Sequence, residues 1–156
     1  MLKVDWPGRL QRLTSGPLVN LLPPGSDLWI DGAHNPDGGR VLAESMAALE
    51  ERKSAPLVMI CGILSTKDSD SFLNCFQGLV KEVIAIPIQS QMTARLPEDV
   101  AEMAQKAGFN ASHYTSITDA LGALHNTIWE KPPRVLITGS LYLIGEILAA
   151  NESRPV

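Results

Sequence analysis

The sequence has little of what marks secreted, membrane or metal-binding proteins. Only two cysteines occur and they lack metal-ligand spacing; Cys61 falls in an apolar strand pattern and Cys75 in a helical one, so both are interpreted as small core residues of a reducing cytosol. The longest apolar run, over 57–64 with one glycine in it, is too short to span a bilayer. Residues 1–9 contain no apolar signal core. These absences predict a soluble, cytoplasmic chain with no membrane contact and no bound metal of its own.

Positive charge is also scarce. Lysine and arginine together number 13 against 17 aspartates and glutamates, which gives a formal net charge of -4. A chain without a basic footprint is not expected to bind nucleic acid. What the sequence does have is a globular composition, with 45% apolar and 19% charged residues. Its 156 residues fit one domain, and a chain of that length buries roughly 70% of its unfolded surface.

Beyond residue 28 the pattern alternates between short apolar strands and amphipathic helices. Strands are predicted over 28–31, 57–61, 83–86, 112–114 and 135–137, and helices over 37–52, 69–79, 97–107, 116–129 and from 141 onward. Val41 is assigned to the apolar face of the first of these helices, and Ile128 to that of the fourth. This alternation predicts an α/β fold with a doubly wound, mostly parallel, Rossmann-like sheet flanked by helices. The Pro- and Gly-rich stretch 15–27 is predicted to be a solvent loop or a hairpin connection.

The first strand-to-helix turn has the most informative composition. In Asp31-Gly32-Ala33-His34-Asn35-Pro36, Asn35 is a good helix N-cap, Pro36 suits the first helical position and Gly32 relaxes the backbone after the strand. Asp31 and His34 are not needed to build the turn. Ligands of doubly wound sheets bind beyond the carboxyl ends of the strands, where these two residues lie. The alternative is that Asp31 closes an Asx-turn and His34 lies on the surface, and turn chemistry alone leaves the two interpretations evenly balanced.

Four ordered motifs resemble one family. The hexapeptide resembles the Asp-x-Ala-His-Asn-Pro element in the C-terminal domain of folylpolyglutamate and dihydrofolate synthases, which belong to the Mur ligase superfamily of ATP-dependent amide-bond-forming enzymes. Pro7-Gly8-Arg9 is similar to the family's Pro-Gly-Arg segment, 62–68 to its Gly-x-x-x-x-Lys-Asp turn, and 137–145 to its closing Gly-Ser motif. The likeness extends over nearly the whole chain, and four matches in order are far more specific than one.

The resemblance implies roles for individual residues. Arg9 and Asp31 are expected to contact the nucleotide, since a guanidinium pairs with phosphate and a carboxylate accepts from ribose hydroxyls. His34 and Ser140 are expected near the incoming glutamate, with Tyr142 lining the same pocket; His34 and Asp31 are the expected catalytic residues. Ser140 is also the natural N-cap of the last helix, and the two roles are compatible because a carboxylate docks well at a helix N-terminus.

The resemblance also implies what accompanies this chain. No Gly-x-x-x-x-Gly-Lys-Ser/Thr and no Gly-x-Gly-x-x-Gly occurs, so ATP and Mg²⁺ are expected to be held mostly by a preceding N-terminal ATPase domain, the chain's expected partner. Residues 1–27 are then a leading segment and loop from that domain, 28–150 the α/β ligase domain and 151–156 a C-terminal tail. The Lys67-Asp68 pair is more simply a solvated turn with a capping residue.

The implied activity is the addition of L-glutamate to folates through an acyl phosphate. Dihydropteroate is a second expected substrate, which would make the parent enzyme bifunctional, and this chain alone is expected to be inactive. Two alternatives remain open at this point. One is a peptidoglycan-precursor ligase domain, against which the Gly-Ser-Leu-Tyr run at 139–142 argues. The other is a stand-alone α/β nucleotide-binding module without chemistry.

Overall fold

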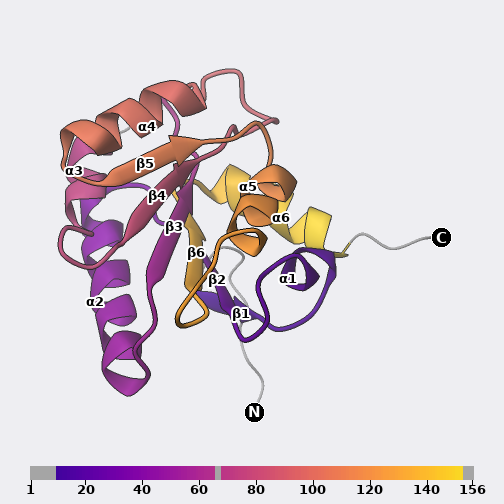
Figure 1. Ribbon diagram of the computed structural model, residues 1–156. Helices are drawn as coiled ribbons and strands as arrows, with labels where there is room; N and C mark the ends of the chain where they lie inside the picture. Colours follow the sequence, from indigo (N-terminus) through magenta and orange to yellow (C-terminus); the bar gives the residue numbers. More distant parts are fainter. Residues whose placement is uncertain (1–9, 66–67, 153–156) are drawn as a thin grey trace, which may run out of the picture.

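A computed structural model describes residues 10–65 and 68–152. Within these ranges one six-stranded sheet has the spatial order β1-β2-β6-β3-β4-β5, with β1 antiparallel to β2 and the other neighbours parallel (Figure 1). The strands are β1 (Gln11–Leu13), β2 (Asp27–Asp31), β3 (Leu57–Cys61), β4 (Glu82–Ala85), β5 (Asn110–His113) and β6 (Arg134–Thr138). The predicted mostly parallel α/β sheet is confirmed.

Helices cover both faces of this sheet. They are α1 (Pro17–Asn20), α2 (Pro36–Arg52), α3 (Ser69–Asn74), α4 (Pro97–Lys106), α5 (Ile117–His125) and α6 (Leu141–Glu152). Helices α2, α3 and α4 lie on one side, and α1, α5 and α6 lie on the other (Figure 1). None of the helices in the described ranges is long and apolar enough to cross a membrane.

Two apolar cores follow from the alternation of side chains along the strands. In β3 every residue is buried, and Val58 and Ile60 pack with α5 and α6 while Met59 and Cys61 pack with α2, α3 and α4. This is the pattern of a strand covered on both faces. Cys61 is the small core residue that was predicted, and burial raises the pKa of its thiol to about 12. Cys75 is only half-buried against the second core and is not a true core residue.

The stretch 15–27 connects the antiparallel strands β1 and β2, so it is the predicted hairpin connection. It is more than a solvent loop, because it contains α1 and buries Leu18 and Leu22 in the core beneath α6. The Asn151 side chain holds the segment in place by accepting from the Leu18 amide at 3.0 Å and donating to the Ser15 carbonyl at 2.8 Å. Residues 11–22, which the sequence interpretation grouped with a leading segment, thus supply a strand and core leucines to the α/β unit.

Several predicted helix limits and faces were wrong. Helix α5 ends at His125 because Thr127 Oγ1 and Trp129 Nε1 donate to carbonyls of its last turn, and Ile128 is therefore 97% exposed. Helix α3 ends at Asn74, after which successive amides bond three residues back as far as the positive-φ Gly78. Val41 is 56% exposed and faces away from the core. The predicted edge strand 112–114 is present as β5 with earlier bounds.

Candidate functional site

The turns that follow β2 and β6 meet at the carboxyl edge of the sheet. The two strands are parallel neighbours whose last residues, Asp31 and Thr138, are paired in register. Beyond them, the Gly139 amide donates to the Ala33 carbonyl at 3.0 Å, and Thr138 Oγ1 donates to the same oxygen at 3.3 Å. These bonds fix the hexapeptide against the start of α6.

Close backbone packing brings in the turn that follows β3. Gly139 has φ +118, and a Cβ built on it would overlap the carbonyl group of Gly62. A Cβ on Gly62 would in turn lie 2.9 Å from the Ile86 carbonyl oxygen, just past the end of β4. Only glycine allows such approaches, so the two glycines of the predicted motifs let the turns of three neighbouring strands pack on one another.

The hexapeptide builds its turn as predicted. The Asn35 side chain accepts from the Gly38 amide at 2.8 Å, and Pro36 is the first residue of α2. Asp31 Oδ1 accepts from the Ala33 amide at 2.8 Å, which is the Asx-turn contact of the alternative interpretation. Asp31 therefore has a structural role, and its role toward a nucleotide stays a prediction.

A small cavity of about 90 Å³ opens at the junction of these turns. It is lined by His34, Leu64, Gly139, Ser140, Leu141 and Tyr142. The imidazole Nδ1 of His34 lies 3.2 Å from the Gly32 carbonyl oxygen. Because a carbonyl only accepts, Nδ1 carries the hydrogen in this contact, and the neutral ring then offers Nε2 as an acceptor.

Ser140 and Tyr142 form another part of the cavity wall. Ser140 is only 2% exposed, and its Oγ accepts from the Tyr142 amide at 3.0 Å, which caps the first turn of α6 as predicted. A serine hydroxyl that accepts one bond keeps its own hydrogen as a donor. The Tyr142 side chain is 53% exposed at the rim. The wall thus combines a hydroxyl donor with the positive end of a helix dipole.

The structure brings together three of the predicted site residues, namely His34, Ser140 and Tyr142. Asp31 lies at the base of the same turn and does not line the cavity. Arg9 and Lys67 lie outside the described residues. Asp68 is the N-cap of α3 and accepts from the Ser71 amide at 3.3 Å, which confirms its predicted capping role.

Sequence reasoning missed the other residues at this edge. Leu64 and Leu141 line the cavity. Both lie inside the predicted motifs, but functional roles were considered only for polar residues of those motifs. Arg95, on the loop between β4 and α4, contacts the turn after β3 and carries no local sequence signal. Over the part of the chain that the structure describes, no three His, Cys, Asp or Glu side chains gather as a metal site requires.

Comparison with known proteins identifies the family to which the chain belongs. Residues 22–150 match the family described as the dihydrofolate synthetase C-terminal domain. The chain belongs to this family. It is 34% identical over 146 residues to the folylpolyglutamate synthase of Lacticaseibacillus casei, covering 91% of this chain and 29% of that protein. It is 25% identical over 162 residues to the dihydrofolate synthetase of Saccharomyces cerevisiae, covering 98% of this chain and 37% of that protein.

Solved structures of the family share the fold. Folylpolyglutamate synthase of Mycobacterium tuberculosis, complexed with ADP and AMPPCP, matches with a TM-score of 0.75 and 23% identity over 98% of this chain and 34% of that one. E. coli FolC in complex with ADP matches with a TM-score of 0.74 and 22% identity over 94% of this chain and 32% of that one. The chain therefore spans about a third of the length of these relatives. The resemblance stated from the motifs is confirmed, and the folate branch is favoured over a peptidoglycan-precursor ligase.

Proposed function

We propose that this chain is the glutamate-side C-terminal domain of a cytoplasmic, ATP-dependent ligase that adds L-glutamate to folates, and that the whole protein also makes dihydrofolate. Family membership supports the reaction class, and the names of the relatives support the substrates. The observation that carries the assignment to glutamate is the cavity that His34 lines together with Ser140 and the first turn of α6.

The cavity matches the chemistry of an amino acid that must act as a nucleophile. The amine of glutamate attacks only when it has lost a proton, and the acceptor Nε2 of His34 is suited to hold or remove that proton. A carboxylate of the same molecule is stabilised by the α6 N-terminus and by the Ser140 hydroxyl. In this proposal His34 orients the amine and Ser140 anchors the carboxylate.

The nucleotide is assigned to the neighbouring part of the same edge. Asp31 is the last residue of β2 and the first of the hexapeptide, where a carboxylate can accept from ribose hydroxyls, and Arg9 is proposed to pair with phosphate. ATP supplies the phosphoryl group that activates the folate carboxylate, and phosphate leaves when the amine attacks. The phosphate cradle and the Mg²⁺ ligands are proposed to belong to a preceding ATPase domain, whose closure on this edge excludes water.

Two substitutions in the complete protein separate these assignments. Asp31→Ala is expected to raise the KM for ATP by about tenfold or more, and His34→Ala to raise the KM for glutamate by a similar factor, because each removes a contact to a charged or strongly polar group. Thermal denaturation checks that both variants remain folded. In a separate measurement, this chain alone is expected to hydrolyse no ATP in response to folate or glutamate. An unchanged KM for ATP together with normal turnover in the Asp31 variant would refute its assignment.

A further inference from the structure

Arg95 lies on a loop that folds back over the turn between β3 and α3. The backbone of this loop pairs with the turn, since the Arg95 amide donates to the Ile63 carbonyl and the Ser65 amide donates to the Thr93 carbonyl, each at 2.8 Å. Leu64 and Ala94 form an antiparallel bridge between these bonds. The far end of the loop is tied separately, because the Glu146 carboxylate accepts from the Ser90 amide at 2.8 Å. The loop backbone is thus held at both ends without help from the Arg95 side chain.

The Arg95 side chain adds two contacts of a different kind. Its Nε donates to Ser69 Oγ at 3.0 Å, and its Nη2 lies 3.4 Å from the Ser65 carbonyl oxygen. Ser69 is 2% exposed at the start of α3, whereas Ser65 lies on the other side of the turn. The guanidinium therefore connects the two described ends of the turn. Its planar fork suits two acceptors in different directions, which a lysine ammonium does not reproduce.

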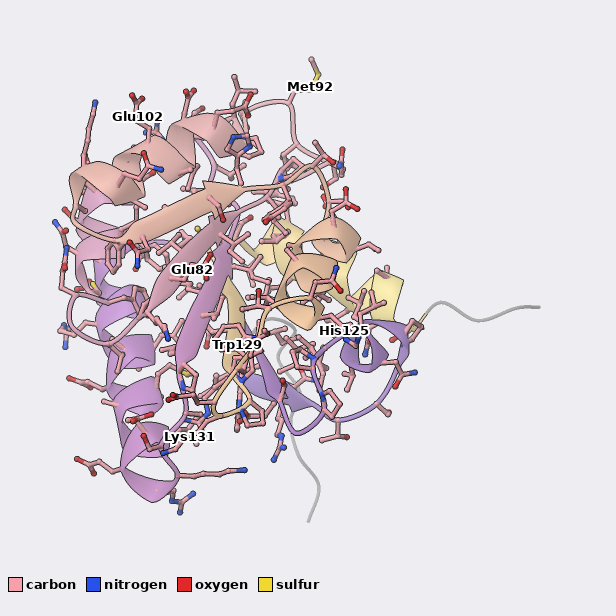
Figure 2. All side chains as sticks on the ribbon, in the orientation of Figure 1. Glu82, Met92, Glu102, His125, Trp129 and Lys131 are labelled. Atoms are coloured by element: carbon pink, nitrogen blue, oxygen red, sulfur yellow. The ribbon has the colours of Figure 1, made fainter. Side chains whose placement is uncertain are left out.

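No carboxylate in the described ranges forms an ion pair with Arg95. The half-buried guanidinium donates its hydrogen bonds to a neutral hydroxyl and a carbonyl oxygen. These contacts order the turn but neutralise no charge. Met92, three residues before Arg95, is fully exposed to solvent (Figure 2), whereas Ile88 at the other end of the loop is buried in the core. Arg95 is the residue of the loop whose side chain contacts both described ends of the turn.

The turn that Arg95 holds forms part of the candidate site. Leu64 lines the cavity together with the first turn of α6 and precedes Ser65, whose carbonyl oxygen accepts from Arg95. We propose that Arg95 is a positioning residue that fixes the Leu64 wall of the cavity and so sets the affinity for glutamate. This inference rests on the proposed function, and among the described residues it adds one that does not line the cavity.

Kinetics of the complete protein test the link to substrate. Arg95→Lys, which keeps the charge, and Arg95→Met, which keeps the length, are both expected to raise the KM for glutamate by about tenfold, with the KM for ATP changed less than about twofold. Arg52→Met, at the exposed end of α2 and the opposite edge of the sheet, is the matched control and is expected to change neither. Full rescue by lysine, or equal changes in both KM values, would overturn the proposal.

Hydrogen exchange tests the positioning without relying on activity. In the Arg95 variants the Ser65 amide is expected to exchange about tenfold faster, because the turn loses its side-chain brace, while the Gly139 amide keeps its rate. Ser69→Ala removes the hydrogen bond between Arg95 Nε and Ser69 Oγ from the serine side, and it should also make the Ser65 amide exchange faster. This variant provides the test if an Arg95 variant fails to fold. Unchanged exchange at Ser65 overturns the proposal. Faster exchange in a protein that ligates no glutamate would instead refute the proposed function and leave the brace established.

Discussion

Gly139→Ala tests whether backbone contact between turns holds the site together. The residue has φ +118, and an added Cβ would overlap the backbone carbonyl group of Gly62, the residue that follows β3. Forcing an L-residue into this conformation costs about 1–2 kcal/mol. Overlap with an atom that cannot rotate away adds about 1–3 kcal/mol. We therefore expect the free energy of unfolding to fall by about 2–5 kcal/mol.

Two other glycines provide matched controls. Gly108 also has a positive φ, +99, but no atom lies within 4 Å of its added Cβ, so Gly108→Ala should show the conformational cost alone, about 1–2 kcal/mol. Gly145 lies inside α6 with open space around it, and Gly145→Ala should stabilise the protein by about 0.5–1 kcal/mol because alanine favours the helix.

Urea denaturation of the three variants, followed by circular dichroism, gives the comparison. The expected order of stability is Gly145→Ala, wild type, Gly108→Ala and then Gly139→Ala. Similar m-values across the set would indicate that the unfolded states are comparable. The reasoning is refuted if Gly139→Ala loses no more stability than Gly108→Ala, since the contact with Gly62 would then contribute nothing.

Two further predictions concern charged groups at the amino edge of the sheet. Asp27→Asn should destabilise the protein by about 3 kcal/mol, because it removes the carboxylate 3.0 Å from the Nε of Arg134. The Arg134 side chain is only 6% exposed and then keeps only the more distant Glu50 carboxylate, 3.9 Å from its Nη1. The exposed Asp37–Arg40 pair is the control, and Asp37→Asn should cost under about 1 kcal/mol in the same urea titration. Burial raises the pKa of Glu82, so the folded state holds a proton that the unfolded state has released, and stability should fall as pH rises from the ordinary carboxyl pKa through the raised value. Glu82→Gln should reduce the dependence of the melting temperature on pH in this range. If the dependence is unchanged, groups other than Glu82 cause it.

Much of the fold was predictable because its signals are local. Strand β3 is an unbroken apolar run, and the helices α2 and α4 begin at prolines, so periodicity and capping located them well. Strand β1 was missed because it is only three residues long and its sole buried residue is Leu13. Its place in the sheet depends on pairing with β2, which no local pattern encodes. The end of α5 was missed for a similar reason, since side chains beyond the helix cap its last turn.

The candidate site was predictable as far as motifs reach. His34 and Ser140 lie at the carboxyl ends of strands, and the topology of a parallel sheet brings such positions together. Leu64 and Arg95 were not predicted, because one is an ordinary apolar residue in a turn and the other acts on a segment about 30 residues away in sequence. Their importance depends on a loop folding back across the edge of the sheet, which composition does not indicate.

The most direct test of the central claim is product analysis by mass spectrometry. The complete protein is incubated with ATP, Mg²⁺, L-glutamate and either a reduced folate or dihydropteroate. We expect a product heavier by one glutamate residue, formed only when ATP and glutamate are both present, together with stoichiometric release of phosphate. Phosphate release without glutamate incorporation, or an unmodified pterin substrate under all conditions, would contradict the account.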